Sequence, residues 1–447
     1  MKILLITSYF PPDHHIGCVR WARLAKYLTM AGHKIFVFSA ENSSEVPQTM
    51  TIDFIPKMVQ RIGYESVFWS PFLKSQDALG EIIKNNKGIE KKDNNNNKIY
   101  RALAQLWNML PRSGKAKEIA NILLTLLGFP HKSWPWANKV YKKALPVVIN
   151  NGIEIIIATH PYAGCMKAAM LLSKKASIPW IADMRDGWSG DFIRGINEKP
   201  LLDKLIKKYE LKLLSTAHRV VTISPELGRK IICDPNKIVY IPNSFDPDEF
   251  KYSKIETDKI NVVYTGNIWT ENSYRIFLDA INIISCENRL DNFHISYYGK
   301  SYSLLKNYAD AIGLESSILI NKGYVSHSEA VKAQCEADLL LAFGWDGKFS
   351  ETVTTGKVLT YLGATRPIIA ICNHATALGR LIKTTGAGIV LPKEKDIEMF
   401  LKTLINTRKK VMWELESKRN FQEIINYSTE NTALLYERLI CNSLKGK

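Results

Sequence analysis

The first 39 residues follow a pattern of apolar and polar positions that few folds allow. Residues 2–8 form a short apolar run that ends at a turn. Residues 19–31 place apolar side chains at helical spacing, and residues 34–39 form a second apolar run. A strand, a helix and a strand in this order make a βαβ unit, and such units build parallel sheets. The chain therefore opens as an α/β protein.

The same order of elements recurs along the rest of the chain. Apolar runs with helical patterns between them occupy residues 154–159, 179–183, 219–223, 261–265, 294–298, 338–343, 367–371 and 388–391. A single core rarely extends beyond about 250–300 residues, and this chain has 447. We therefore predict two doubly wound, Rossmann-like domains followed by a helical segment that packs back on the first domain. Their expected bounds are 1–245, 258–412 and 413–447, with a turn-rich linker over 242–259.

Residues 54–147 break this pattern, and we predict an insertion there. They show no clear strand alternation and include an Asn-rich, low-complexity run at 91–98. Four tryptophans stand among basic side chains: Trp69, Trp107, Trp134 and Trp136. Aromatic and basic residues around short apolar helices suit a membrane interface. They equally suit an insertion that packs on its own domain, and periodicity does not separate the two.

The charge balance limits the classes of partner that the protein is expected to bind. Lys and Arg outnumber Asp and Glu by 60 to 43, a net charge of +17. This excess favours phosphorylated substrates, an anionic membrane surface or nucleic acid, or it is an ordinary basic surface. The seven cysteines form no CxxC pair, which argues against a disulfide framework and a cysteine zinc site. We expect a cytoplasmic protein, and any membrane contact to be peripheral at the inner face, because no stretch approaches the ~20 apolar residues that span a bilayer.

Eight segments, taken in order, resemble the retaining GT-B glycosyltransferases of the family-4 type. They include the opening βαβ unit, "IADMRDGW", "IVYIPNSFDPDEF", "VVYTGNIW" and "TGKVLTYLGATRPIIAI". The resemblance implies two domains facing a cleft, and transfer of a sugar from a nucleoside diphosphate sugar to an acceptor hydroxyl with retention. It implies neither a cofactor nor a metal, and nucleic acid is not an expected partner. Asp246-Pro247-Asp248 has the Asp-x-Asp pattern of a metal-binding motif, but it lies in the linker, where a turn explains it.

In the first domain, candidate site residues follow the predicted strands. Gly17 lies in the first loop, where its backbone lets N–H groups approach an anion, and Arg20 adds charge in the next helix. The resemblance implies that this loop faces the transferred sugar. His160 can bond a sugar hydroxyl or leaving oxygen, or it is a turn histidine. Asp183, with Arg185 nearby, is part of an ion pair, or it binds the acceptor or acts as a carboxylate base for the attacking hydroxyl. We expect a mainly structural role for Arg185.

In the second domain, the resemblance places the donor. Gly266 and Asn267 close its first strand, but the basic pair usual in the family is incomplete, and the nearest downstream cation is Arg275. Arginine can hold a diphosphate through two parallel hydrogen bonds. The resemblance also implies that Tyr324 and Val325 lie beside the nucleobase.

Residues 351–361 depart from the family pattern. The family has two glutamates, of which the first lies near the donor sugar and the second binds the ribose. Glu351 matches the first, but Leu359 stands eight positions later, and Thr360 occupies the place of the second glutamate. Thr355, Gly356 and Lys357 start a helix and make a candidate diphosphate cradle, or an ordinary helix cap with an exposed lysine.

Three functions remain open at this stage. The first is a transferase, with His160, Asp183 and Glu351 as catalytic residues and a lipid-linked saccharide in surface polysaccharide synthesis as acceptor. The second is a degenerate homologue that binds a nucleotide or scaffolds an assembly without catalysis, as the changes at Asn267 and Thr360 allow. The third is a nucleotide-sugar epimerase with the same fold.

Overall fold

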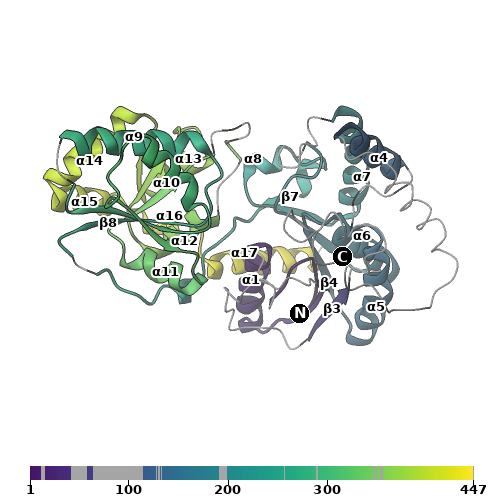
Figure 1. Ribbon diagram of the computed structural model, residues 1–447. Coiled ribbons are helices and arrows are strands. Elements are labelled where there is room, and N and C mark those ends of the chain that lie inside the picture. The colour runs from purple at the N-terminus through teal and green to yellow at the C-terminus, as the bar shows by residue number, and fades with distance from the viewer. Residues whose placement is uncertain are drawn as a thin grey trace, which may run out of the picture.

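The computed structural model places most of the chain in two α/β domains that lie side by side (Figure 1). The structure describes residues 1–11, 16–41, 58–63, 114–126, 128, 131, 133–190, 199–255, 257–287, 290–345, 347, 350–352 and 356–445. None of the helices within these ranges is long and apolar enough to cross a membrane.

The first domain is built on a seven-stranded parallel sheet in the order β3-β2-β1-β4-β5-β6-β7. Its central strands are fully buried apolar runs, as a sheet covered by helices on both faces requires. The strands are β1 (Lys2–Thr7), β2 (Lys34–Glu41), β3 (Met58–Gly63), β4 (Ile155–His160), β5 (Trp180–Met184), β6 (Arg219–Thr222) and β7 (Ile238–Tyr240).

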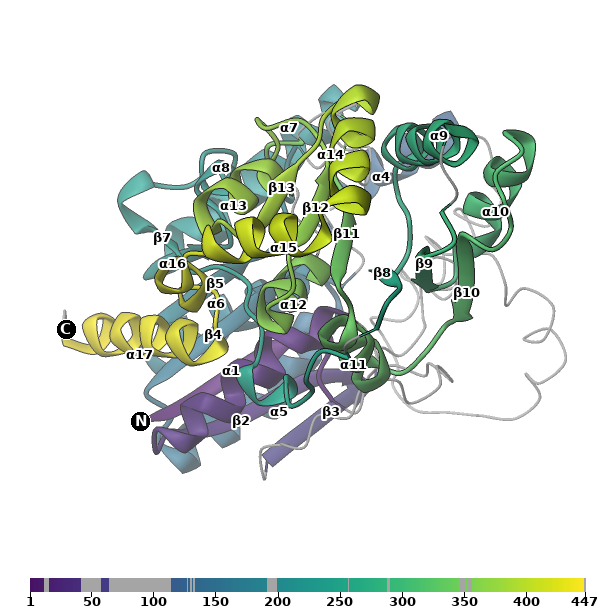
Figure 2. The ribbon, with the colours of Figure 1, turned by 90° about the vertical axis from the view of Figure 1, so that its left-hand side faces the viewer.

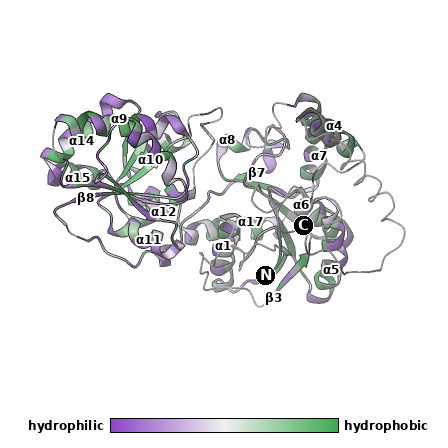
Figure 3. Cartoon of the chain, viewed as in Figure 1, coloured by the Kyte–Doolittle hydropathy of each residue, from purple (hydrophilic) through white to green (hydrophobic). Residues whose placement is uncertain are grey.

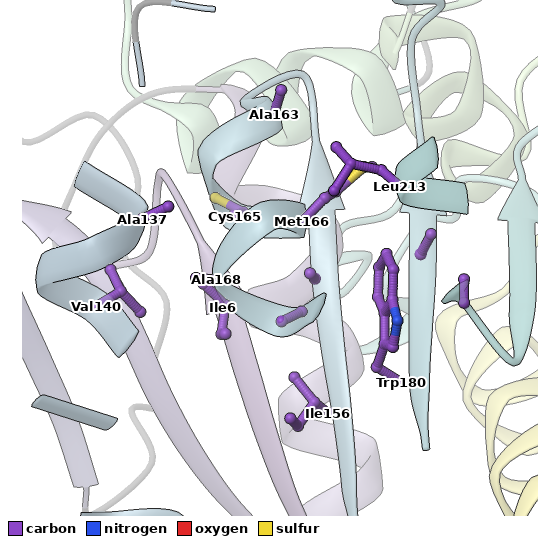
Figure 4. Close-up of a cluster of buried hydrophobic side chains, with 14 of the residues drawn as sticks. Ile6, Ala137, Val140, Ile156, Ala163, Cys165, Met166, Ala168, Trp180 and Leu213 are labelled. Carbon is purple, nitrogen blue, oxygen red and sulfur yellow. The ribbon is translucent and has the colours of Figure 1, made fainter. Parts of the chain in front are cut away.

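Helices cover both faces of this sheet. The first-domain helices are α1 (Val19–Met30), α4 (Gly114–Leu126), α5 (Trp136–Asn151), α6 (Ala163–Ala176), α7 (Pro200–Thr216) and α8 (Pro225–Gly228), with short 3-10 turns at η1 (Ile16–Cys18), η3 (Pro235–Lys237) and η4 (Pro247–Glu249). Figure 4 shows the core on one face, where Met166 of α6 and Leu213 of α7 pack over Ile156 and Trp180 of the sheet.

The second domain repeats the architecture with six parallel strands in the order β10-β9-β8-β11-β12-β13 (Figure 2). The strands are β8 (Ile260–Thr265), β9 (Phe293–Tyr298), β10 (Leu319–Gly323), β11 (Leu339–Phe343), β12 (Ile368–Ile371) and β13 (Gly388–Val390). The helices are α9 (Glu271–Glu287), α10 (Tyr302–Ala311), α11 (His327–Glu336), α12 (Gly356–Ala364), α13 (Ala377–Thr385), α14 (Glu394–Asn406) and α15 (Arg408–Ser417). The prediction of two doubly wound, Rossmann-like sheets is confirmed.

The chain crosses between the domains twice at one place. On the way out, Phe245 accepts a backbone hydrogen bond from Thr429 and donates one to the carbonyl of Tyr427. On the way back, α16 (Phe421–Ile425) leads into α17 (Thr429–Lys445), which lies against α1 of the first domain (Figure 1).

Residues 54–147 are not wholly an insertion, because β3 lies within them. This strand pairs in parallel with β2, and the carbonyl of Ile62 accepts a hydrogen bond from the indole of Trp136 at the start of α5. The sequence "MVQRIG" hides the strand because Gln60 and Arg61 interrupt the apolar alternation. At least β3 and α5 therefore belong to the first domain proper.

Candidate functional site

Lys357 lies where the carboxyl end of β8 meets the first turn of α12. Its Nζ donates a hydrogen bond of 3.0 Å to the carbonyl of Asn267 and another to the hydroxyl of Tyr264. It also lies 3.9 Å from the centroid of the Tyr264 ring, a cation–π distance. Two predicted donor residues, Asn267 and Lys357, are thus in direct contact.

Gly266 shapes the loop beside this lysine. Its φ is +94°, a left-handed backbone that glycine adopts without cost, and a Cβ atom there would lie 3.5 Å from Cε of Lys357. Its carbonyl accepts a hydrogen bond of 3.0 Å from the hydroxyl of Tyr297. The glycine therefore lets the backbone turn closely around the lysine.

Lys357 is a half-buried cation that has no carboxylate partner among the described residues. Burial lowers its pKa to about 7, and no carboxylate among the described residues offsets this. A buried charge that lacks a partner costs free energy, and a bound anion would offset that cost. Because α12 begins at Gly356, its N-terminus adds a partial positive charge at the same place. The arrangement is suited to bind an anion such as a diphosphate.

The loop after β9 is tied to this site. The backbone N–H of Lys300 donates to Oδ1 of Asn267, and the Ser301 hydroxyl accepts from the N–H of Ile268. The Lys300 ammonium lies 4.3 Å from the ring centroid of Tyr324. The predicted nucleobase residue Tyr324, with the half-buried Val325 after it, therefore stands at the same edge of the sheet as Asn267.

Glu351 lies at a contact between the domains. Its carboxylate accepts a hydrogen bond of 2.9 Å from Lys230, which follows α8 of the first domain, and this bond lowers the pKa of Glu351. Arg380 of α13 donates to the carbonyl of Glu351 and pairs at 3.3 Å with Glu226 of α8. The residue expected beside the donor sugar thus faces the first domain.

Thr360 is engaged within its own helix. Its hydroxyl donates a hydrogen bond of 2.7 Å to the carbonyl of Lys357, and the side chain is buried. The next residue, Tyr361, accepts a hydrogen bond from the N–H of Thr265 and fixes α12 against β8. Thr360 keeps only acceptor capacity for a ribose. Gly356 is exposed at the helix start, and Thr355 lies outside the described residues.

Arg275 stands apart from Lys357. It lies on α9, where it pairs with Glu271 at 3.0 Å and lies 5.1 Å from the ring centroid of Tyr308 on α10. The polar contacts that the structure gives Arg275 are on these two helices. The structure therefore does not join Arg275 to the loop after β8.

Arg20 and Asp183 form a buried ion pair, the structural alternative that the sequence left open for Asp183. Both carboxylate oxygens of Asp183 accept from the Arg20 guanidinium, and they also accept from the indole of Trp21 at 2.7 Å and the hydroxyl of Tyr436 at 2.7 Å. The guanidinium of Arg20 also donates to the carbonyls of Ile241 and Pro242 and to the side-chain oxygen of Asn243.

The charge of Arg20 is therefore fixed by its surroundings. Burial by itself lowers the pKa of Arg20, but the charge of Asp183 and the contact with Tyr436 outweigh burial and raise it. This network ties α1, β5, α17 and the start of the linker together. A carboxylate so occupied has no position left for a substrate proton.

Arg185 connects Gly17 to His160. It donates a hydrogen bond of 2.6 Å to the carbonyl of Gly17 and one of 3.1 Å to the carbonyl of His160. His160 is fully buried, and its ring centroid lies 6.1 Å from that of Trp188. The structure brings Gly17 and His160 together, but through backbone carbonyls and a positioning arginine.

Sequence reasoning missed three side chains of this region. Tyr264, which contacts Lys357, is indistinguishable in sequence from a core residue of a strand. Lys230 shows no local signal, since it meets Glu351 only when the domains come together. Arg380 shows none because it stands 29 positions after Glu351 in the same domain. Within the described ranges, no group of three or more His, Cys, Asp or Glu side chains could hold a metal.

No protein-family model and no curated protein matches the chain. Solved structures do match over nearly its whole length. Sucrose-phosphate synthase from Thermosynechococcus elongatus superposes with a TM-score of 0.62 at 12% identity, covering 100% of both chains. Anabaena HepE, solved in complex with UDP and glucose, gives 0.60 at 12% identity over 99% of this chain and 100% of its own.

A third match has a different activity in its description. A protein from Listeria monocytogenes described as a UDP-N-acetylglucosamine 2-epimerase gives a TM-score of 0.54 at 10% identity, covering 100% of this chain and 97% of its own. At these identities the likeness concerns the fold. The chain has the GT-B fold of two Rossmann-like domains.

Proposed function

We propose that this chain is a glycosyltransferase that moves a sugar from a nucleoside diphosphate sugar to an acceptor hydroxyl with retention. The observation that carries the proposal is the half-buried Lys357, which has no carboxylate partner in the described part of the chain and stands between the Gly266–Asn267 turn and the N-terminus of α12. The negative charge of a departing diphosphate must be stabilised. Lys357 and the N-terminus of α12 can supply this stabilisation without a metal. The UDP complex of HepE makes UDP the first nucleotide to test.

The diphosphate role moves from Arg275 to Lys357. Arg275 is exposed and already pairs with Glu271, whereas Lys357 is half-buried beside the turn that the donor is expected to approach. A charge-assisted hydrogen bond is stronger in such a dry site than at the surface.

Glu351 is proposed to face the transferred sugar. Lys230 now holds its carboxylate, but both side chains are partly exposed, and such surface pairs contribute only about 0–1 kcal/mol. A donor can therefore replace Lys230 at little cost. Tyr324, backed by Lys300, is proposed to contact the nucleobase.

The acceptor is proposed to be a lipid-linked saccharide. The net charge of +17 supports work at an anionic surface or on a phosphorylated lipid. The epimerase alternative keeps one observation in its favour, the fold shared with the Listeria monocytogenes protein. The non-catalytic alternative rests on Thr360, whose hydroxyl proton is taken by the carbonyl of Lys357.

One experiment separates these functions. The full chain is incubated with a panel of nucleoside diphosphate sugars, with and without a lipid extract, and products are identified by mass spectrometry. A transferase releases nucleoside diphosphate faster with the extract and forms a glycosylated lipid. An epimerase converts the donor without an acceptor, and a binding protein converts nothing, so either result contradicts the proposal.

A matched pair of variants tests the assigned roles in that assay. Glu351→Gln should lower turnover while UDP affinity stays unchanged, since Glu351 is assigned to the sugar. Glu271→Gln, which removes an exposed carboxylate on α9, serves as the control and should leave both unchanged.

A further inference from the structure

Helix α4 exposes an aliphatic stripe where a surface helix normally exposes polar side chains. Ile119, Leu123 and Leu126 are 55%, 53% and 62% exposed. They follow spacings of four and three residues and so lie on one face of the helix. The opposite face carries the buried Leu124 and Thr125. The helix therefore has apolar side chains on its outer face as well as its inner one.

Helix α7 lies beside α4 and has a basic outer face. The hydroxyl of Tyr209 on α7 donates a hydrogen bond of 2.9 Å to the carbonyl of Thr125 on α4, and the helices contact each other (Figure 1). The exposed residues of α7 are one proline, two leucines, four lysines and two hydroxyl residues: Pro200, Leu201, Lys204, Lys207, Lys208, Leu211, Lys212, Ser215 and Thr216. No carboxylate is exposed on this helix.

The exposed side chains of the two helices are neighbours on the surface of the first domain, because the helices lie side by side. Each helix turns its buried side to the domain, and the two are joined through Tyr209 and Thr125, so their exposed sides belong to one layer. Figure 3 shows α4 and α7 together at the end of the first domain, with green apolar and purple polar stretches on adjacent turns. Of the exposed lysines, only Lys207 has an acidic partner among the described residues, Asp203.

We propose that this α4–α7 surface, defined by Ile119, Leu123, Leu126, Lys204, Lys208 and Leu211, docks on an anionic lipid bilayer. Aliphatic side chains enter the boundary between headgroups and acyl chains, and lysines beside them neutralise lipid phosphates. A second copy of the same surface would place like charges opposite each other, which disfavours a dimer. The surface belongs to the first domain, so docking would hold the proposed acceptor side at the membrane.

The test uses the full chain and vesicles of phosphatidylcholine with or without phosphatidylglycerol. At about 0.1 M salt the protein should sediment with the anionic vesicles only, and at about 1 M salt less of it should sediment, because the Debye length shrinks from about 10 to about 3 Å. Lys204→Glu with Lys208→Glu should weaken binding at least about 25-fold, since each basic residue near the surface contributes about fivefold. Leu123→Ser with Leu126→Ser should weaken it roughly 10- to 30-fold.

Matched controls lie on the second domain. Lys409→Glu with Lys410→Glu reverses two exposed charges on α15, and Met399→Ser removes an exposed apolar side chain on α14. Both should bind vesicles as the unchanged protein does. Thermal melting of every variant confirms that the fold is intact.

Three results would overturn the proposal. One is no sedimentation with anionic vesicles at low salt. Another is equal binding by the α4–α7 variants and the unchanged protein. The third is a dimer, seen by analytical ultracentrifugation without vesicles, that Leu123→Ser abolishes, because a second copy would then cover the stripe. Since vesicle binding needs no donor sugar, its failure is distinguishable from failure of the proposed transferase activity.

Discussion

At the residue scale, Lys357 is a cation for which the described part of the chain supplies no carboxylate. Its two hydrogen-bond acceptors, the carbonyl of Asn267 and the hydroxyl of Tyr264, are neutral, and burial lowers its pKa to about 7. A diphosphate beside it would favour the charged form. Binding of the nucleotide and of a proton should therefore be coupled.

This coupling predicts that UDP affinity falls as pH rises from about 7 to about 9, by up to about tenfold per pH unit. Above its free pKa, Lys357 must gain a proton to bind, so the complex takes up protons. Calorimetry at pH 8 in two buffers of different ionisation enthalpy measures that uptake. Lys357→Arg stays charged at every accessible pH and should lose the dependence. Equal pH profiles of the two proteins would disprove the coupling.

Asp183 gives a second prediction at this scale. Asp183→Asn removes the only carboxylate that pairs with the buried Arg20 in the described chain, so the free energy of unfolding should fall by about 3–5 kcal/mol. Urea unfolding measures this loss. UDP affinity of the folded variant should stay unchanged. Full stability with abolished turnover would instead restore the catalytic role first considered for Asp183.

At the element scale, α17 acts as part of the first domain although it ends the chain. Its Tyr436 bonds Asp183 and Arg20, and Ile440 is completely buried against β1 and α1 neighbours such as Ile3 and Leu28. The core of the first domain is therefore complete only when α17 packs against it.

Ile440→Ala should accordingly destabilise the protein by about 2–5 kcal/mol, the usual cost of deleting a buried aliphatic side chain. Leu434→Ala on the same helix changes a side chain that is 46% exposed and should cost much less. Chemical denaturation followed by tryptophan fluorescence compares them. If both variants lost equally little free energy of unfolding, α17 would not be needed to stabilise the first domain.

The elements that sequence patterns missed share a position. β3, β7 and β10 are all edge strands, and their sequences are short or polar because one side lacks a strand partner. The central strands were predicted within one or two residues, since burial on both faces makes them continuous apolar runs. At the site, the family resemblance pointed to Gly266 and Asn267, and the local pattern at a helix start pointed to Lys357. The hydrogen bond from Tyr436 to Asp183 was not predicted, because the two residues are 253 positions apart.

At the scale of the whole molecule, Glu249 joins the two domains. Its carboxylate accepts from Arg23 of α1 at 2.6 Å and from His327 of α11 at 2.9 Å. Burial raises the pKa of Glu249, but the hydrogen bonds and charges of His327 and Arg23 outweigh it and lower the pKa to about 2. The contact should persist above the unfolded value near pH 4.3 and weaken as pH falls toward 2.

Glu249→Gln should loosen the relative placement of the domains, because the variant loses the charge that both partners share. Small-angle X-ray scattering at neutral pH should report a larger radius of gyration without donor. Asp248→Asn, which alters an exposed carboxylate one residue earlier, is the control. Superimposable curves for all three proteins would contradict the role of Glu249.

The central claim is that a nucleoside diphosphate binds at Lys357. Isothermal titration of UDP into the unchanged protein, Lys357→Met and Arg275→Ala tests it most directly. Loss of a charge-assisted hydrogen bond of about 1.5–3 kcal/mol should weaken binding roughly 10- to 150-fold in Lys357→Met. Arg275→Ala should bind as the unchanged protein does. The opposite order, or no binding of any nucleoside diphosphate by the unchanged protein, would contradict the account.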